Sequence, residues 1–549
     1  LLKEKSSLEP ETLTLFDLFM EDLDMGGRYG IFSEILEPRL EEIIREENIE
    51  SIANLMDGRL NTLFRYMLGD EFAGLFHTYL QLEARCPHTI GYDRRAQRSA
   101  NPSNHLDHAR DAWLQFLKLR ATGFSVEAIL KGGNTPEDTE EFSGYMNSSY
   151  WLAAQIAQGN EKVIEYLNQV LTSENNVHRL QRWYLHAIAI SGYRPLLELE
   201  GKLLLAAKLQ EGLRQAIVET MDEGCPESYL YLFSIIYNNG LQRFASVKRS
   251  IAVCTGIGEQ DSSERITNKY VELIWNFLNH PETARNALQS KDTVELYLAL
   301  WSIGFYDTDE IRAIVPDIIR KGAKHQIQTL LYFLRCTQSS QMNHLISKDA
   351  FEVWHDDPKV VAAILPLYMD GLYLSRYSDN KEAPTLSDYF ESPEEAVRHY
   401  GYLKQVYQSI SAKEIYSPYV FPWDCVVLTR SDVVHKMAYI AWMTNDIRLR
   451  EELCTYLPAL ESYSRASYIG IVLAHTESKV EQEYVLQSLG DRSSDIRDEA
   501  YKVLSEMSLS PEQYQNIEEL LRFKYSEMRI NAINLLMKQP EAQLAASIR

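Results

Sequence analysis

The sequence predicts an all-α protein, built as an extended and curved α-solenoid of repeated helix pairs. Two observations lead to this prediction. Apolar residues recur at steps of three and four along most of the 549 residues, which is the spacing of one face of a helix. The stretches between these runs are mostly short, and no predicted helix is long enough to bury its apolar face alone. Each helix must therefore pack on its neighbours in the chain.

The stretch 203–258 shows this pattern most clearly. A first helix is expected to bury the side chains of Ala206, Leu209, Leu213, Ile217 and Met221. Pro226 suits the first turn of a second helix, where its missing N–H would have no partner, and Gly240 ends that helix. A third helix then turns Val247 and Ile251 inward before two glycines break the pattern. The alternation of helix and short turn is typical of a helical solenoid.

The same stretch carries a resemblance to a known family. The strings LQEGLRQAIVETMDEG and LQRFASVKRSIAVCTGIG resemble a segment of the MolR-like group of large bacterial proteins, whose function is unknown. The resemblance extends loosely to PYVFPWD at 418–424. It implies a HEAT-like helical region in an intracellular, multi-domain protein, with further domains after it. It brings no catalytic residue with it.

The chain is acidic overall. It has 55 Lys plus Arg against 78 Asp plus Glu, a formal net charge of −23, which opposes attraction to phosphate backbones and anionic lipids. No apolar run approaches the length that crosses a membrane. Six cysteines are scattered without a C-x-x-C pair, as in reduced, buried thiols of a cytoplasmic protein.

Polar loops divide the predicted solenoid without ending it. We expect a continuous superhelix in three parts, an N-terminal helical block at 1–130, central repeats at 131–411 and C-terminal HEAT-like repeats at 412–549. Ser392, Pro393 and Glu395 predict a helix start with a capping box after the loop at 374–390. Because the chain lacks an initiator methionine and a polar cap, we expect an excised fragment.

The clearest repeat lies in the C-terminal part. Leu457, Leu489 and Leu521 stand 32 residues apart, and Arg465, Arg497 and Arg529 keep the same spacing. Asp495 and Glu527 each come two residues before one of these arginines, whereas the first copy has a tyrosine there. In HEAT repeats such residues bond between neighbouring turns and helices. The pattern therefore predicts a structural ladder of charged residues.

The signatures of catalysis are missing, so we expect neither an enzyme nor a cofactor. There is no G-x-x-x-x-G-K-[ST], no G-x-S-x-G and no H-E-x-x-H. Cys86, His88, His105 and His108 are weak candidates for a metal, because the last two lie one helical turn apart. C-x-H is not a common zinc motif, and acidic neighbours make an equally good solvated face. We predict no metal site.

Two stretches are possible interaction sites. Arg94, Arg95 and Arg98 form the strongest basic patch of the chain, either a charged loop that pairs with local acids or a contact for nucleic acid. Tyr419, Phe421 and Trp423 lie in a proline-containing aromatic run that either fills the seam between helical layers or presents a ridge to a partner. We predict a non-enzymatic scaffold for a protein partner or another domain of the parent chain. The alternative is a nucleic-acid-binding protein, which the net charge disfavours.

Overall fold

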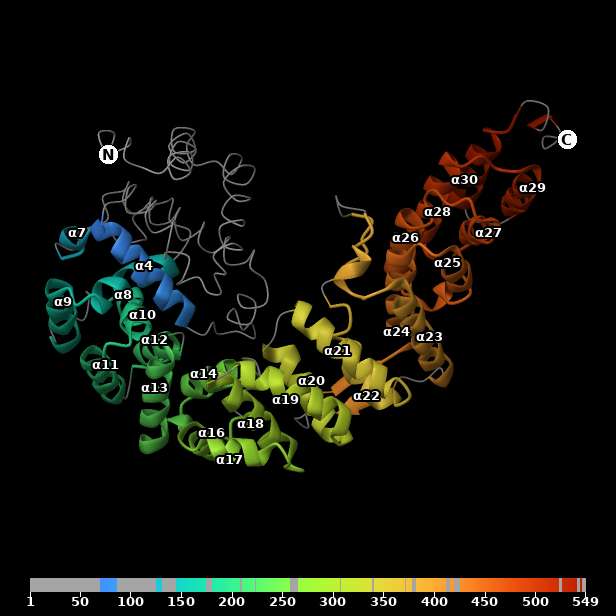
Figure 1. Cartoon of the computed structure of the whole chain (residues 1–549). Coiled ribbons are helices and arrows are strands. Elements are labelled where there is room, and N and C mark those ends of the chain that lie inside the picture. Colours follow the sequence, from blue (N-terminus) through green and yellow to red (C-terminus); the bar gives the residue numbers. More distant parts are fainter. Residues whose placement is uncertain are drawn as a thin grey trace, which may run out of the picture. The chain divides into compact units, whose positions relative to one another are not determined.

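The computed structural model consists mostly of α-helices, which confirms the all-α prediction (Figure 1). It describes residues 70–85, 125–130, 145–173, 180–207, 210–222, 224–256, 265–306, 308–337, 340–370, 372–377, 382–410, 415–418, 425–522, 526–540 and 544–545. Within this part of the chain, every helix is too short or too polar to span a lipid bilayer.

The chain divides into two compact units. The first holds residues up to 313 together with 333–339, and the second holds 314–332 together with the chain from 340 onward. The boundary falls in α19 (Thr308–Lys321) and α20 (Lys324–Thr337). It lies inside the predicted central block, and the three-part division stays a prediction.

Helices in the first unit form two rows. Their bounds are α4 (Asp70–Arg85), α7 (Val126–Leu130), α8 (Tyr145–Ala157), α9 (Glu161–Thr172), α10 (Arg182–Ser191), α11 (Arg194–Ala206), α12 (Glu211–Asp222), α13 (Pro226–Asn239), α14 (Ala245–Cys254), α16 (Asn268–Asn279), α17 (Pro281–Ala287) and α18 (Thr293–Tyr306). Contacts run α4–α8–α10–α12–α14 in one row and α7–α9–α11–α13 in the other. From α4 to α14 a helix therefore packs mainly on the helix after next, and its immediate neighbour lies in the opposite row, whereas α17 packs mainly on α18, which follows it in the chain.

The second unit shows the same alternation near its end. Its helices are α21 (Ser340–Trp354), α22 (Pro358–Ile364), α23 (Pro393–Ser409), α24 (Arg430–Thr444), α25 (Ile447–Leu453), α26 (Ser462–Ile471), α27 (Lys479–Ser488), α28 (Ser494–Glu506), α29 (Pro511–Glu519) and α30 (Ser526–Leu536). Helices α26, α28 and α30 follow one another on one side, and α25, α27 and α29 on the other (Figure 1).

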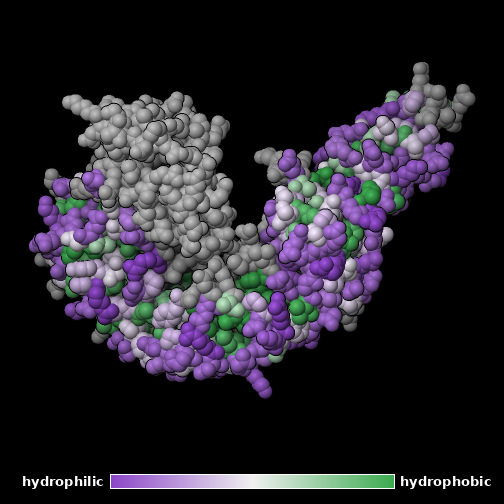
Figure 2. Space-filling view, viewed as in Figure 1, coloured by the Kyte–Doolittle hydropathy of each residue, from purple (hydrophilic) through white to green (hydrophobic). Residues whose placement is uncertain are grey.

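Apolar side chains lie between the rows. Eight successive residues of α10, from Trp183 to Ile190, are buried, and so are eight of α18, from Leu296 to Ile303. Hydrophilic side chains dominate the face of the molecule seen in Figure 2. Because α10 and α18 are buried on all sides over these residues, they show no amphipathic stripe. Periodicity therefore could not predict which neighbours they contact.

The first helix predicted in 203–258 is wrong at its start. Helix α11 ends at Ala206, and α12 begins only at Glu211. The Arg214 guanidinium donates from Nη2 to the Ala207 carbonyl oxygen at 2.8 Å, which satisfies a carbonyl just past the end of α11. The second helix begins at Pro226 and ends before Gly240, as predicted. Gly240 has a φ of 59°, a left-handed conformation that suits glycine.

A pair of strands occurs where the sequence indicated only a break between helices. Strand β1 (Ile415–Pro418) is antiparallel to β2 (Cys425–Leu428), with Ile415 opposite Leu428 and Pro418 opposite Cys425. Both strands contact α22. The aromatic residues Tyr419, Phe421 and Trp423 belong to the connection between the strands, which lies outside the described residues. The choice between seam and ridge stays open.

The repeat arginines make different contacts. Arg465 Nη2 contacts Asp491 Oδ2 at 2.8 Å, and Arg497 Nη2 contacts Glu527 Oε2 at 2.9 Å, so each reaches toward the next repeat. Asp495 instead accepts from Arg376, outside the repeat. Arg529 is exposed and has no ion pair among the described residues.

Replacing Arg497 with alanine is expected to lower the free energy of unfolding by about 1 to 3 kcal/mol. The arginine is mostly buried, and its Nη1 also donates to the carbonyl oxygens of Asp491 and Arg492, at 3.0 Å each. The change leaves these acceptors without their donor. Denaturant unfolding measures the loss, with Arg529→Ala as the control that should unfold like the wild type. Equal stability of both variants would show that the Arg497 contacts contribute nothing.

Candidate functional site

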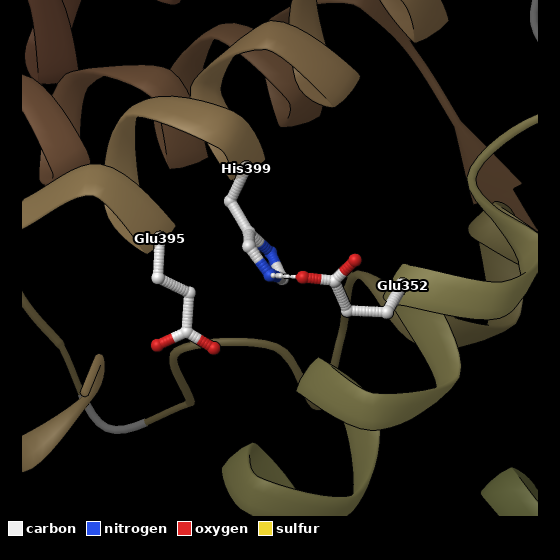
Figure 3. Close-up of side chains that lie close together, drawn as sticks. All are labelled: Glu352, Glu395 and His399. Carbon is white, nitrogen blue, oxygen red and sulfur yellow. Dashed lines mark hydrogen bonds and ion pairs between the residues drawn. The ribbon is translucent and has the colours of Figure 1, made fainter. Parts of the chain in front are cut away.

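A cluster of charged and aromatic side chains lies between α21 and α23 in the second unit (Figure 3). His344, Lys348 and Glu352 follow one another at steps of four on α21, so they share one face of that helix. Glu395 and His399 hold the same spacing on α23. Lys348 Nζ lies 3.1 Å from Glu395 Oε1, and His399 Nε2 lies 2.9 Å from Glu352 Oε1. Two polar stripes therefore face each other across the helix pair.

The start of α23 positions Glu395. Ser392 is the N-cap, as predicted, and its hydroxyl accepts from the Glu395 N–H at 3.2 Å. The predicted capping box closes differently, because Glu395 Oε2 accepts from the backbone N–H of Glu391 at 2.6 Å. Burial raises the pKa of Glu395, but the hydrogen bonds from Glu391 and Lys348 outweigh it, so the pKa lies below the ordinary value. Glu395 is thus held as a carboxylate.

His399 is a neutral link between two partners. Its ring is fully buried, and Nδ1 accepts from the Tyr368 hydroxyl at 2.8 Å while Nε2 donates to Glu352. This pattern assigns the proton to Nε2. Burial lowers the pKa of His399, and the charge of Glu352 opposes that effect only in part. Burial also raises the pKa of Tyr368 well above its ordinary value, so the hydroxyl keeps its proton.

His344 holds a strained turn in place. Its Nδ1 accepts from the Met369 N–H at 2.9 Å, and its Nε2 donates to the Tyr389 carbonyl oxygen at 3.0 Å. Met369 has a φ of 52°, which costs a residue other than glycine about 1 to 3 kcal/mol. Burial lowers the pKa of His344 to about 4. The neutral ring thus offers one acceptor and one donor to two backbone groups at neutral pH.

The arrangement of these side chains resembles two kinds of reactive site, a metal centre and a catalytic triad. One oxygen or nitrogen of Glu352, Glu395 and His399 can be chosen so that all three lie within 4.8 Å of one another, and carboxylates with an imidazole can ligate zinc or manganese. However, Glu352 already accepts from Arg398, with Nη2 to Oε1 at 2.6 Å, and Glu395 pairs with Lys348. Both carboxylates are neutralised by cations that a metal ion would have to displace. The residues present do not fit a metal centre.

The chain of bonds Tyr368–His399–Glu352 has the connectivity of a catalytic triad. Such a triad needs a hydroxyl that a substrate can reach. Tyr368 and His399 are fully buried. The cluster is therefore a clasp that joins α21 to α23. We call it the polar clasp, defined by His344, Lys348, Glu352, Glu395 and His399.

The polar clasp was not predicted from the sequence. The signal was present as H-x-x-x-K-x-x-x-E from 344 to 352 and E-x-x-x-H from 395 to 399. Polar residues four apart on a helix with apolar neighbours mark a face that pairs with another polar face. The two stripes lie more than forty residues apart, so the pairing itself was not visible.

A second constellation lies on the surface of the same unit. Tyr373 and Tyr377 are 68% and 73% exposed, the highest values among the large apolar side chains of the described residues. The Tyr463 hydroxyl, at the start of α26, lies 3.2 Å from the Tyr373 hydroxyl and 2.6 Å from Ser375 Oγ. Arg376 lies between the two exposed rings in sequence, and its side chain is only 9% exposed. We call Tyr373, Arg376, Tyr377 and Tyr463 the tyrosine surface.

The segment 372–377, which carries Tyr373, Arg376 and Tyr377, is bonded to three neighbouring helices. Arg376 Nη2 contacts Asp495 Oδ1 at 2.7 Å, and the Arg376 N–H donates to Ser467 Oγ at 3.3 Å. The Tyr439 hydroxyl donates to the Leu372 carbonyl oxygen at 2.7 Å. These bonds join the segment to α24, α26 and α28. The exposed rings are therefore presented by an anchored backbone.

Other predicted site residues fall outside the described part. These residues are the weak metal candidates Cys86, His88, His105 and His108, the basic patch Arg94, Arg95 and Arg98, and the aromatic residues Tyr419, Phe421 and Trp423. Asp495, predicted as a repeat acid, lies instead under the tyrosine surface.

No curated protein and no solved structure matches the chain. The model of a family of unknown function, DUF5724, matches residues 15–549. The resemblance to the MolR-like group and the HEAT-like assignment stay predictions. Because the match covers nearly the whole sequence, the chain belongs to the DUF5724 family.

Proposed function

We propose that the chain is an α-solenoid of HEAT-like repeats that acts as a non-enzymatic scaffold and binds a protein partner through the tyrosine surface. The two-row alternation of helices from α4 to α14 and from α25 to α30 supports the repeat architecture. The bonds from Arg465 and Arg497 toward the next repeat support the HEAT-like assignment. Cys225 and Cys454 are buried free thiols, which supports a reducing, cytoplasmic setting. The resemblance to the MolR-like group supports a larger bacterial protein.

The single observation that carries the binding role is the exposure of Tyr373 and Tyr377 on an anchored segment. Between them, Leu374 and Ser375 are buried, so the segment turns its two largest rings outward while its smaller side chains face the helices. Tyrosine and arginine are enriched among the residues that dominate binding energy at interfaces. A ring that is already held in place loses little conformational freedom on binding. The tyrosine surface has the composition and order of a protein-binding site.

A peptide-display library tests this function. Random peptides displayed on phage are selected on the immobilised full chain, and the selected clones are tested again on the variant Tyr373→Ala/Tyr377→Ala. We expect clones that lose binding by about tenfold or more on this variant, because truncating two central aromatic anchors costs at least about 1.4 kcal/mol.

Two controls make the result decisive. Both substituted rings are exposed, so the double variant should keep the wild-type melting temperature. Tyr306→Ala removes an exposed tyrosine of the first unit and should leave binding unchanged. Selected clones that bind the double variant as well as the wild type would overturn the binding role of the tyrosine surface.

Binding of nucleic acid through Arg94, Arg95 and Arg98 remains the alternative prediction. A heparin column separates it from the scaffold role, since retention that falls steeply with salt indicates contacts with phosphate. The net charge of −23 leads us to expect flow-through at low salt.

A further inference from the structure

We propose that the tyrosine surface binds an arginine-bearing segment of a partner polypeptide, with the guanidinium stacked on the exposed ring of Tyr377. This inference rests on the proposed scaffold function and names the chemistry of the partner.

The rings of the tyrosine surface already hold one guanidinium. The Arg376 guanidinium carbon lies 4.9 Å from the centroid of the Tyr377 ring and 5.9 Å from that of the Tyr463 ring. These two centroids are 6.2 Å apart, with an angle of 34° between the ring planes. Both distances from Arg376 are within the range of a cation–π contact, so this pair of rings accepts a guanidinium beside it. The Tyr377 side chain is 73% exposed, so much of its ring stays open to solvent beside Arg376.

The charge of Arg376 does not oppose a second cation strongly. Asp495 contacts its Nη2 at 2.7 Å, and Glu499 Oε1 lies 3.5 Å from its Nη1. The side chain of Asp495 is half exposed, so part of its negative charge faces solvent beside the rings. The positive charge of Arg376 is thus neutralised by Asp495 and Glu499. The exposed aromatic rings can attract a further cation.

The charge of the whole chain selects among possible occupants. At a formal net charge of −23, the chain repels a second copy of itself and repels acidic peptides. It attracts basic segments, and attraction of this kind raises the rate of encounter. Arginine suits the site better than lysine, because a planar guanidinium stacks on an aromatic ring, whereas the lysine ammonium is a compact, strongly hydrated charge.

The test measures binding of fluorescent peptides to the full chain by anisotropy at physiological ionic strength. The probes are a peptide of alternating glycine and arginine, the same peptide with citrulline in place of arginine, and the same peptide with glutamate. Citrulline keeps the shape of arginine without its charge. We expect the arginine peptide to bind at least about tenfold more tightly than the citrulline peptide, and the glutamate peptide not to bind.

Variants locate the binding. Tyr373→Ala/Tyr377→Ala should weaken the arginine peptide by about tenfold, Tyr373→Phe/Tyr377→Phe should keep most of the affinity, and Tyr306→Ala should keep all of it. Equal affinity of the arginine and citrulline peptides would overturn the inference. So would an arginine peptide that binds the alanine variant as well as the wild type, because it would then bind the acidic surface in general.

The two proposals fail in different ways. Display clones that depend on Tyr373 and Tyr377 but carry no basic residue would leave the scaffold function standing and refute the arginine partner. Clones indifferent to both tyrosines would refute the binding role of the surface, whatever the peptides show.

Discussion

Replacing Lys348 with methionine is expected to lower the free energy of unfolding by about 3 to 5 kcal/mol, the largest loss of any single change considered for this protein. The Lys348 and Glu395 side chains are only 8% and 12% exposed, and their charged atoms lie 3.1 Å apart. Methionine keeps the apolar stem and removes the charge, so Glu395 stays buried as an uncompensated carboxylate. Urea unfolding followed by circular dichroism measures the loss.

A second substitution separates charge from packing at the same place. In Lys348→Met/Glu395→Gln the buried negative charge is gone, and the amide oxygen still accepts from the Glu391 N–H. This double variant should recover a large part of the lost stability. Lys321→Met removes an exposed lysine that pairs with Asp317 and should have no measurable effect. If Lys348→Met unfolds like Lys321→Met, the polar clasp does not hold α21 to α23.

Replacing Glu200 with glutamine is expected to change how the stability of the chain depends on pH. Glu200 lies on α11, is fully buried, and neither carboxylate oxygen has a hydrogen-bond partner. Burial raises its pKa well above the ordinary 4.5, and the nearby Thr220 hydroxyl offsets only part of this effect. The folded chain therefore holds a proton that the unfolded chain releases.

The sign of the effect follows from this difference. At pH values well below 4.5 the Glu200 carboxyl is protonated in both the folded and the unfolded chain, so folding buries no charge there. As the pH rises through the window between the unfolded and the raised folded pKa, the wild type loses stability, by about 1.4 kcal/mol for a pKa difference of one. Glu200→Gln does not titrate. Its stability relative to the wild type should grow with pH across that window.

Unfolding curves at several pH values above 4.5 measure this growth. Glu198→Gln, which removes an exposed carboxylate from the same helix, is the control whose difference from the wild type should stay small. A constant difference between Glu200→Gln and the wild type at all pH values would mean that the Glu200 pKa is the same in both states.

The helices themselves could be predicted from the sequence because their signals are local. Pro226 and Gly240 mark the ends of α13 through their own backbone preferences, and Ser392 caps α23 through a bond to a residue three positions away. Local signals failed where a distant group intervened. The end of α11 lies beside the Arg214 guanidinium, which reaches a carbonyl seven residues back.

The repeat spacing predicted charged contacts between helices, and the tyrosine content predicted aromatic contacts. Neither predicted which residues would meet. The 32-residue spacing indicated that Arg465 and Arg497 bond between neighbouring helices, and the acids they contact lie in the next repeat. Asp495 shares that spacing, yet it binds Arg376, 119 residues earlier. Among 33 tyrosines, the composition does not separate Tyr368, buried against His399, from Tyr377 at the surface.

By itself, the sequence determined that the chain is helical, where many helices begin and end, and which face of most helices is apolar. These properties depend on backbone preferences and on side chains three or four residues apart. Only the tertiary structure decided which faces meet. It alone joined Lys348 to Glu395 and set Tyr373 and Tyr377 beside Tyr463, because the pattern of one helix does not specify which distant helix will cover it.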